Sequence, residues 1–117
     1  GRKDVFLCEK NKKKAFFLKE VIRNLNLKVK VVNSSINCVE PLKADILSAR
    51  AFSELKDLIQ IAYHHRKEGG VCLFLKGENY RFELDKTLNY WFFDYDVVDS
   101  LSNPSGKIIR VKKILKL

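Results

Sequence analysis

Short unbroken apolar runs alternate with helical repeats of apolar residues along the first three quarters of this chain. Each run is bounded by charged residues or by Asn, Ser and Gly, a pattern typical of buried strands between turns. The runs lie at residues 4–9, 28–33, 46–47 and 71–75. The pattern therefore predicts four strands separated by other elements.

Between these runs, apolar residues recur at steps of three and four, as on one face of an amphipathic helix. A first helix is predicted after Asn11, with apolar positions at Ala15, Leu18, Val21, Ile22 and Leu25. A second helix has apolar positions at Leu55, Leu58, Ile59 and Ala62. We expect Ser53 to cap the second helix and Arg66 to lie near its negative end. Gly69 is expected to end it in the left-handed conformation.

The run from Val71 to Leu75 is apolar on both of its faces. A strand without a polar face is typical of a central parallel strand that helices cover on both sides. Together with the alternation of strands and helices, this run predicts an α/β fold with a parallel sheet. Lys76 would then emerge at the carboxyl end of the strand.

Beyond Lys76 the pattern changes to a short helix and a hairpin. The helix is predicted at about 78–88, and two strands at 89–100 and 106–115 are separated by the turn-rich residues SNPSG. The hairpin has one predicted core face, formed by Trp91, Phe93, Tyr95 and Val97. Tyr90 and Phe92 suit either packing or stacking on a base.

The predicted strand ends carry polar residues to one edge of the sheet. Open α/β sheets bind ligands outside the carboxyl ends of their strands. The polar positions at these ends are Glu9, residues 33–37, residues 48–50 and Lys76. We therefore expect these side chains to share one site.

Length and composition bound the class of protein. The 117 residues are 46% apolar, which suits one small domain with its own core. No apolar run reaches the roughly 18 residues that cross a bilayer, and no secretory apolar block is present near residue 1. We expect a soluble, cytoplasmic protein. The three cysteines are odd in number and widely spaced, which predicts reduced thiols rather than a disulfide framework or a metal site.

The charge balance is strongly basic. Twenty-three Lys and Arg oppose fourteen Asp and Glu, giving a formal charge of +9. Such a charge attracts polyanions, and nucleic acid is the obvious partner. A compositional bias toward Lys, Asn and Ile explains the charge equally well, and the cluster from Lys10 to Lys14 fits either an RNA contact or an exposed helix start.

Three segments, ADILSARAFSEL, EGG with LFLKG, and FLCEKNKKKAFFLKEV, occur here in a characteristic order. In them the chain resembles the glucose-inhibited division protein B family from about residue 4 to residue 114. The resemblance implies a Rossmann-like class I methyltransferase sheet with a C-terminal antiparallel hairpin. It also implies transfer of a methyl group from S-adenosylmethionine to N7 of a guanine in 16S ribosomal RNA of the small subunit.

The resemblance implies roles for individual residues. Glu9 matches the acid that binds the cofactor ribose, and Ile36 and Asn37 match the pair beside the adenine. Arg50 matches a basic residue of the cofactor site, and Lys76 matches a lysine at the catalytic rim. Other roles remain open: Glu9 as a helix cap, Arg50 in an ion pair with an acidic neighbour, and Lys76 as a solvated strand terminus.

The family's first strand and glycine-rich loop have no counterpart in this chain. We expect them before Gly1, and we expect the 117 residues by themselves to bind cofactor poorly. Because that strand would lie between the strands at 4–9 and 46–47, its absence predicts a gap in the sheet with two unprotected edges. The family's Arg and acid in the third-strand loop are also replaced, by Ser35 and Asn37.

Guanine N7 is already nucleophilic, so this reaction demands positioning rather than a strong base. No catalytic or metal-binding role is expected for His64 or His65. A non-catalytic RNA-binding or ribosome-assembly module on the same scaffold is the alternative function. An α/β interaction domain with a charge of compositional origin is the third.

Overall fold

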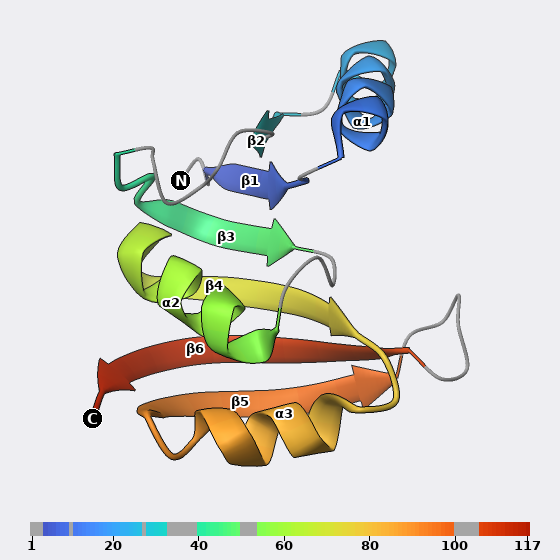
Figure 1. Ribbon diagram of the computed structural model, residues 1–117. Coiled ribbons are helices and arrows are strands. Elements are labelled where there is room, and N and C mark those ends of the chain that lie inside the picture. The colour runs from blue at the N-terminus through green and yellow to red at the C-terminus, as the bar shows by residue number, and fades with distance from the viewer. Residues whose placement is uncertain (1–3, 10, 27, 33–39, 50–53, 100–105) are drawn as a thin grey trace.

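The computed structural model describes residues 4–9, 11–26, 28–32, 40–49, 54–99 and 106–117. Helices α1, α2 and α3 follow β1, β3 and β4, whereas β2 is followed by β3 with no helix in the described residues between them, and β5 and β6 come after α3 (Figure 1). The elements are β1 Val5–Cys8, α1 Lys12–Asn24, β2 Val29–Val32, β3 Ala44–Ala49, α2 Leu55–His65, β4 Arg66–Lys76, α3 Tyr80–Thr87, β5 Trp91–Asp99 and β6 Lys107–Lys116. Among the described residues, no helix is long and apolar enough to cross a membrane.

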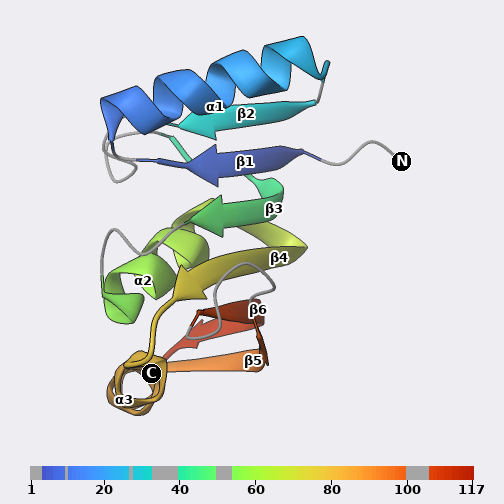
Figure 2. The ribbon, with the colours of Figure 1, turned by 90° about the vertical axis from the view of Figure 1, so that its right-hand side faces the viewer.

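The strands form a six-stranded sheet in the order β2-β1-β3-β4-β6-β5, read from top to bottom in Figure 1. β1, β2, β3 and β4 are parallel, and their arrows point the same way in Figure 2. β6 is antiparallel to both β4 and β5. The predicted α/β class, the parallel strands and the C-terminal hairpin are therefore confirmed.

The predicted gap in the sheet is wrong. β1 pairs directly with β3, from Val5 opposite Ile46 to Cys8 opposite Ala49. The pairing begins one residue before β1, where the Asp4 carbonyl accepts hydrogen bonds from the backbone N–H groups of Asp45, at 3.0 Å, and Ile46, at 3.1 Å. Two parallel strands with free facing edges satisfy their backbone groups by pairing with each other, so the described sheet has no internal break.

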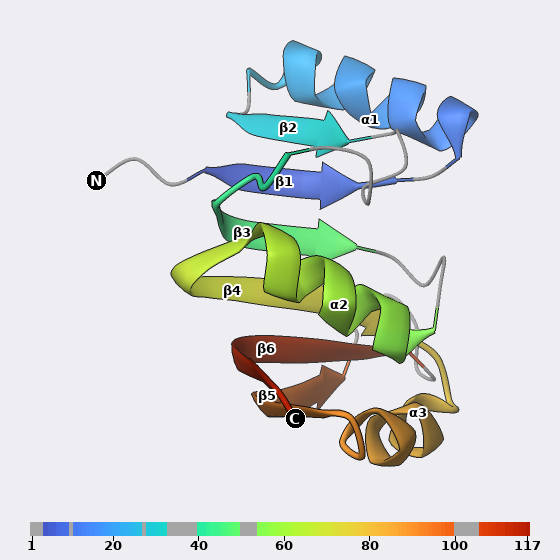
Figure 3. The ribbon, with the colours of Figure 1, turned by 60° about the vertical axis from the view of Figure 1, so that its left-hand side comes forward.

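The hydrophobic core lies between the sheet and the helices α2 and α3, which lie in front of it in Figure 1. Phe74 and Leu47 project from the sheet into this core, and Leu58 and Ile59 project from α2; all four are fully buried. α1 runs alongside β2 at the edge of the sheet (Figure 3) and buries only Ala15 well.

The boundary between α2 and β4 differs from the prediction. α2 ends at His65, and β4 already begins at Arg66. Gly69 has the predicted left-handed φ, of 84°, but it lies inside the strand. The register moves from Ala44 opposite Arg66 to Ile46 opposite Val71, so three extra residues of β4 form an irregularity around Gly69.

Hydrogen bonds of the Arg66 side chain explain why the chain leaves the helix at this residue. The Arg66 guanidinium donates to the Gly70 carbonyl at 2.8 Å and also to the Lys112 carbonyl on β6. These bonds hold the irregularity between α2 and β6. A helix continued through Arg66 would break both of them.

The start of α2 and one face of the hairpin also differ from the prediction. The N-cap position of α2 is Glu54, and the predicted cap Ser53 lies outside the described residues. On the hairpin, Trp91 and Phe93 are buried as predicted, but Tyr95 is 43% exposed and follows a register shift between Asp94 and Tyr95, which interrupts the alternation of faces along β5.

Candidate functional site

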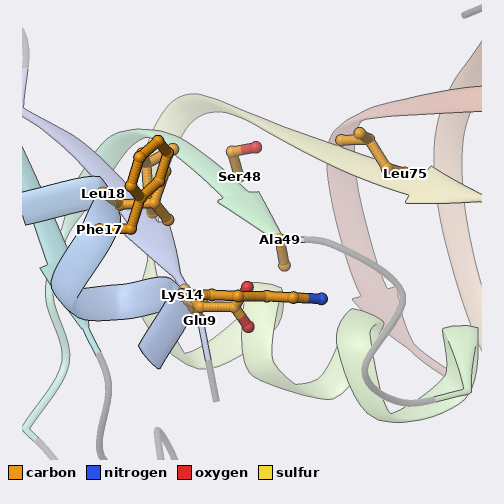
Figure 4. A pocket seen from close by; sticks show the side chains of 9 residues that line it. Glu9, Lys14, Phe17, Leu18, Ser48, Ala49 and Leu75 are labelled. Atoms are coloured by element: carbon orange, nitrogen blue, oxygen red, sulfur yellow. The ribbon is translucent and has the colours of Figure 1, made fainter. Parts of the chain in front are cut away.

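A cavity of about 360 Å³ opens at the edge of the sheet where β1, β3 and β4 end (Figure 4). β1 and β3 form its floor, α1 forms one wall, and the end of β4 forms another. Its lining is Leu7, Cys8, Glu9, Lys14, Phe17, Leu18, Ser48, Ala49 and Leu75. The parallel strands thus create a hollow at the edge where the sequence predicted one.

Glu9 is the carboxylate of this cavity. It follows β1 directly, and its backbone N–H donates to the Val32 carbonyl at 3.0 Å, which continues the ladder to β2. Its side-chain Oε2 accepts a hydrogen bond from the Asn11 backbone N–H at 3.3 Å. The residue is 7% exposed, so the carboxylate is held at the floor of the cavity. A carboxylate in this place suits a ligand with hydroxyl groups.

The helix-cap alternative for Glu9 is only partly fulfilled. The Asn11 side chain caps α1 by accepting a hydrogen bond from the Lys14 N–H at 3.0 Å. Glu9 supports the same turn by accepting a hydrogen bond from the backbone N–H of Asn11, the N-cap residue. The acid therefore orients the start of α1 and still lines the cavity.

The remaining walls are mostly apolar and come from different elements. Leu7 projects from β1, Leu18 and the 65% exposed Phe17 from α1, and Leu75 from β4. Such walls suit a flat or apolar part of a ligand. Figure 4 shows Lys14 on the same side of the cavity as Glu9, so the lining includes one cation and one carboxylate.

Lys76 lies at the carboxyl end of β4 as predicted, but on the other face of the sheet. It alternates with the cavity residue Leu75 and shares a face with the core residue Phe74. Its side chain is 6% exposed, and its Nζ lies 2.8 Å from Oε1 of Glu83. The alternative of a solvated strand terminus is therefore wrong.

Three predicted site residues, Ile36, Asn37 and Arg50, lie outside the described residues. Of the four side chains expected to converge, the structure describes Glu9 and Lys76. Both lie at the same edge of the sheet, Glu9 directly after β1 and Lys76 at the end of β4, and β3 lies between these strands. They do not line the same cavity.

Sequence reasoning missed two contributors to this edge. Phe17 belongs to the cavity wall, although its place on α1 gave it no role in the helical repeat. Glu83 binds Lys76 from the middle of α3. No sequence pattern indicates the second contact, because it depends on how α3 turns back beside β4.

Histidine and cysteine side chains have structural roles in the described part of the chain. The buried His65 accepts a hydrogen bond from the Leu42 N–H at 3.1 Å through Nδ1, whereas His64 is exposed. No group of three metal-ligating side chains occurs among the described residues. Burial raises the pKa of the Cys8 thiol to about 11 and that of Cys72 to about 12, so both stay protonated.

The aromatic residues considered for base stacking lie away from this edge. Tyr90 and Phe92 are 60% and 45% exposed and therefore are not core residues. They lie where β5 begins. Because β5 is antiparallel to β6, and β6 to β4, this end of β5 lies at the edge opposite to the cavity.

Comparison with protein families gives one match of nearly full length. The family model of rRNA small subunit methyltransferase G matches residues 2–110. A ribosomal RNA small subunit methyltransferase G from Paramagnetospirillum magneticum is 39% identical over 114 residues, covering 97% of this chain and 56% of the relative. The protein of that name from Ruegeria pomeroyi is 35% identical, covering 96% and 55%. The chain thus spans about half the length of these curated relatives.

Solved structures show the same fold at low sequence identity. A ribosomal protein L11 methylase from Lactobacillus delbrueckii superposes with a TM-score of 0.70 at 18% identity, covering 97% of this chain and 59% of the other. An S-adenosylmethionine-dependent methyltransferase from Clostridium acetobutylicum gives 0.66 at 14% identity, covering 94% and 75%. These likenesses show a Rossmann-like class I methyltransferase fold with antiparallel C-terminal strands.

Proposed function

This chain belongs to the rRNA small subunit methyltransferase G family, and from that membership we propose that its parent protein methylates 16S ribosomal RNA. The methyl donor is S-adenosylmethionine and the acceptor is N7 of a guanine. Because ribosomal RNA is the substrate, we place the protein in the bacterial cytoplasm.

The observation that carries the proposal is the buried Glu9 carboxylate at the floor of a largely apolar cavity. A carboxylate at a strand end accepts hydrogen bonds from both hydroxyls of a ribose. The apolar side chains around it provide a surface for the flat adenine ring. Glu9 and the walls together fit the nucleoside half of S-adenosylmethionine.

The other predicted residues complete the proposed site. Ile36 and Asn37 would lie beside the adenine, and Arg50 would bind the cofactor carboxylate, in line with the motifs that they match. Lys76 would stand at the acceptor side of the rim, since β4 lies beyond β3 from Glu9. These four assignments rest on the family motifs.

Methyl transfer to guanine N7 requires the protein mainly to position the two reactants. S-adenosylmethionine supplies an electrophilic methyl group when it is bound. Guanine N7 has an exposed lone pair and no proton to lose, so no general base is needed. The catalytic demand on the protein is to align the acceptor and to exclude water. A rim without a His–acid pair fits this demand.

The first turn of α1 supports an RNA substrate. Lys12, Lys13 and Lys14 are exposed there, and no acidic residue accompanies them in that turn. Cations at a helix N-terminus oppose the helix dipole, so this arrangement costs some helix stability. It places positive charge beside the cavity, where a phosphate backbone would approach.

Calorimetric titration of the complete gene product with S-adenosylmethionine tests the proposal. We expect micromolar binding that Glu9→Ala weakens about ten- to hundredfold, because a hydrogen bond to a charged group contributes about 1.5–3 kcal/mol. Glu20→Ala removes a carboxylate of α1 that pairs with Arg23 and whose side chain is 37% exposed, and it serves as the matched control.

Absence of binding by the wild-type protein would refute the enzymatic proposal. If the same protein bound RNA with a steep dependence on salt, the alternative of a non-catalytic RNA-binding or ribosome-assembly module would hold. Equal weakening by Glu20→Ala would show that the effect of Glu9→Ala does not come from the cavity.

A further inference from the structure

One carboxylate oxygen joins three elements at the carboxyl edge of the sheet. Oε1 of Glu83, on α3, lies 2.8 Å from Nζ of Lys76 at the end of β4. The same oxygen accepts a hydrogen bond of 2.8 Å from the backbone N–H of Leu55, the first residue of α2. Glu83 therefore ties β4, α2 and α3 together at one point.

Glu83 replaces the missing side-chain cap of α2. Glu54 occupies the N-cap position and makes no side-chain cap hydrogen bond there. The first N–H groups of a helix need acceptors, and the positive end of the helix dipole favours a carboxylate. Glu83 meets both needs from a neighbouring helix, 28 residues along the chain from Leu55.

The backbone at Glu83 is itself held in place. Oγ1 of Thr87, one turn later on α3, donates to the Glu83 carbonyl at 2.7 Å. Thr87 is 1% exposed and the neighbouring Leu84 is 4% exposed, so this face of α3 is packed into the protein. The carboxylate consequently projects from a rigid element.

The ion pair between Lys76 and Glu83 is expected to contribute little to the free energy of unfolding. Its side chains are 6% and 21% exposed, for Lys76 and Glu83 respectively. An ion pair so poorly hydrated gains little net free energy over apolar side chains of similar size, because both charges lose water. The pair does, however, join the last residue of β4, which follows the cavity residue Leu75, to α3.

We propose that Glu83 is a positioning residue that, through Lys76 and the first turn of α2, sets the geometry of the acceptor side of the rim. The inference rests on the proposed function. Lys76 lies on the opposite face of β4 from the cavity residue Leu75, so neither Lys76 nor Glu83 lines the cavity of Glu9. Its loss should slow methyl transfer and leave cofactor binding nearly unchanged.

A direct role of Lys76 makes a different prediction. If its ammonium bound a substrate anion, removal of Lys76 would cost far more activity than removal of Glu83. If the two act as one unit, either removal has the same effect, and removing both adds nothing.

The test is a double-mutant cycle in the complete gene product, with Lys76→Met, Glu83→Ala and the double variant. We measure kcat and KM for S-adenosylmethionine and for the ribosomal substrate, together with Tm. Each variant is expected to lower kcat about tenfold, since a small misplacement at a reacting centre has effects of this order or more. KM for S-adenosylmethionine should stay within about twofold.

Glu83→Gln provides the conservative variant, because its amide oxygen still accepts the Leu55 N–H. It should recover most of the kcat that Glu83→Ala loses. Asp85→Ala removes an exposed carboxylate from the same helix and is the matched control, expected to behave as the wild type.

Three results would overturn the inference. A much larger loss of kcat in Lys76→Met than in Glu83→Ala would make Lys76 a direct ligand. Wild-type kcat in both variants with a lowered Tm would reduce the junction to a stabilising contact. Failure of the wild-type protein to transfer methyl groups would instead remove the proposed function and the inference with it, so the two failures are distinguishable.

Discussion

Gly70 should tolerate no side chain, because backbone surrounds it on β4. It is buried, and a Cβ at this position would lie 2.5 Å from the carbonyl oxygen of Ala44 and 2.9 Å from that of Lys67. The carbonyl oxygen of Asp45 would lie at 3.2 Å. None of these atoms can rotate away as a flexible side chain can.

Gly70→Ala should therefore lower the free energy of unfolding by about 3 kcal/mol, near the upper end of the usual overpacking cost. Gly69→Ala has open space around its Cβ, but its φ of 84° disfavours a side chain by about 1–2 kcal/mol. Gly77→Ala meets nothing within 4 Å and needs no positive φ, so it should be neutral or more stable by about 0.4–1 kcal/mol.

Urea unfolding of the three variants of the complete gene product gives the comparison, with the m-value used to check that the transition is unchanged. The expected order of stability is Gly77→Ala, then Gly69→Ala, then Gly70→Ala. If Gly70→Ala were as stable as Gly77→Ala, β4 would not pass β3 as closely as the structure shows, and the irregularity around Gly69 would be wrong.

Three further predictions concern the core. Cys8 and Cys72 should resist thiol reagents at pH 8 until the protein unfolds, because burial raises the pKa of both thiols. For the same reason the free energy of unfolding should be unaffected by these thiols below the ordinary pKa of 9.0. It should fall as the pH rises from there toward 11–12, where the unfolded chain loses the thiol protons more readily than the folded protein. His65→Leu should cost about 1–3 kcal/mol, because the Leu42 N–H loses its acceptor, as urea unfolding would show. Phe74→Ala should cost about 3–5 kcal/mol in the same assay, since the ring is fully buried.

Exposed neighbours of the same residue type are the controls for these core variants. His64→Leu and Phe82→Ala change an exposed histidine and a 72% exposed ring, and each should shift stability by no more than about 0.5 kcal/mol. Equal losses in a variant and its control would contradict the burial described for the core. Rapid labelling of all thiols in the folded protein would do so for the cysteines.

The order of strands and helices could be predicted from the sequence because periodicity is a local property. The apolar runs, the repeats of three and four residues and the turn signals depend only on near neighbours, and they predicted an element at or near each described strand and helix, although only Ile46 and Leu47 of β3. The same local reasoning placed Glu9 and Lys76 at strand ends of one edge, since parallel strands carry their carboxyl ends to the same side.

Tertiary contacts decided the rest, because they join residues that no local pattern connects. Gly69 adopts the left-handed φ that its type favours, yet Arg66, through its bond to the carbonyl of Lys112 on β6, places that glycine in a strand instead of at a helix end. β1 and β3 closed the expected gap because free backbone groups pair wherever the chain brings them together. The ion pair of Glu83 with Lys76 also depends on tertiary packing, because no spacing in the sequence indicates that α3 packs against the face of β4 on which the lysine lies.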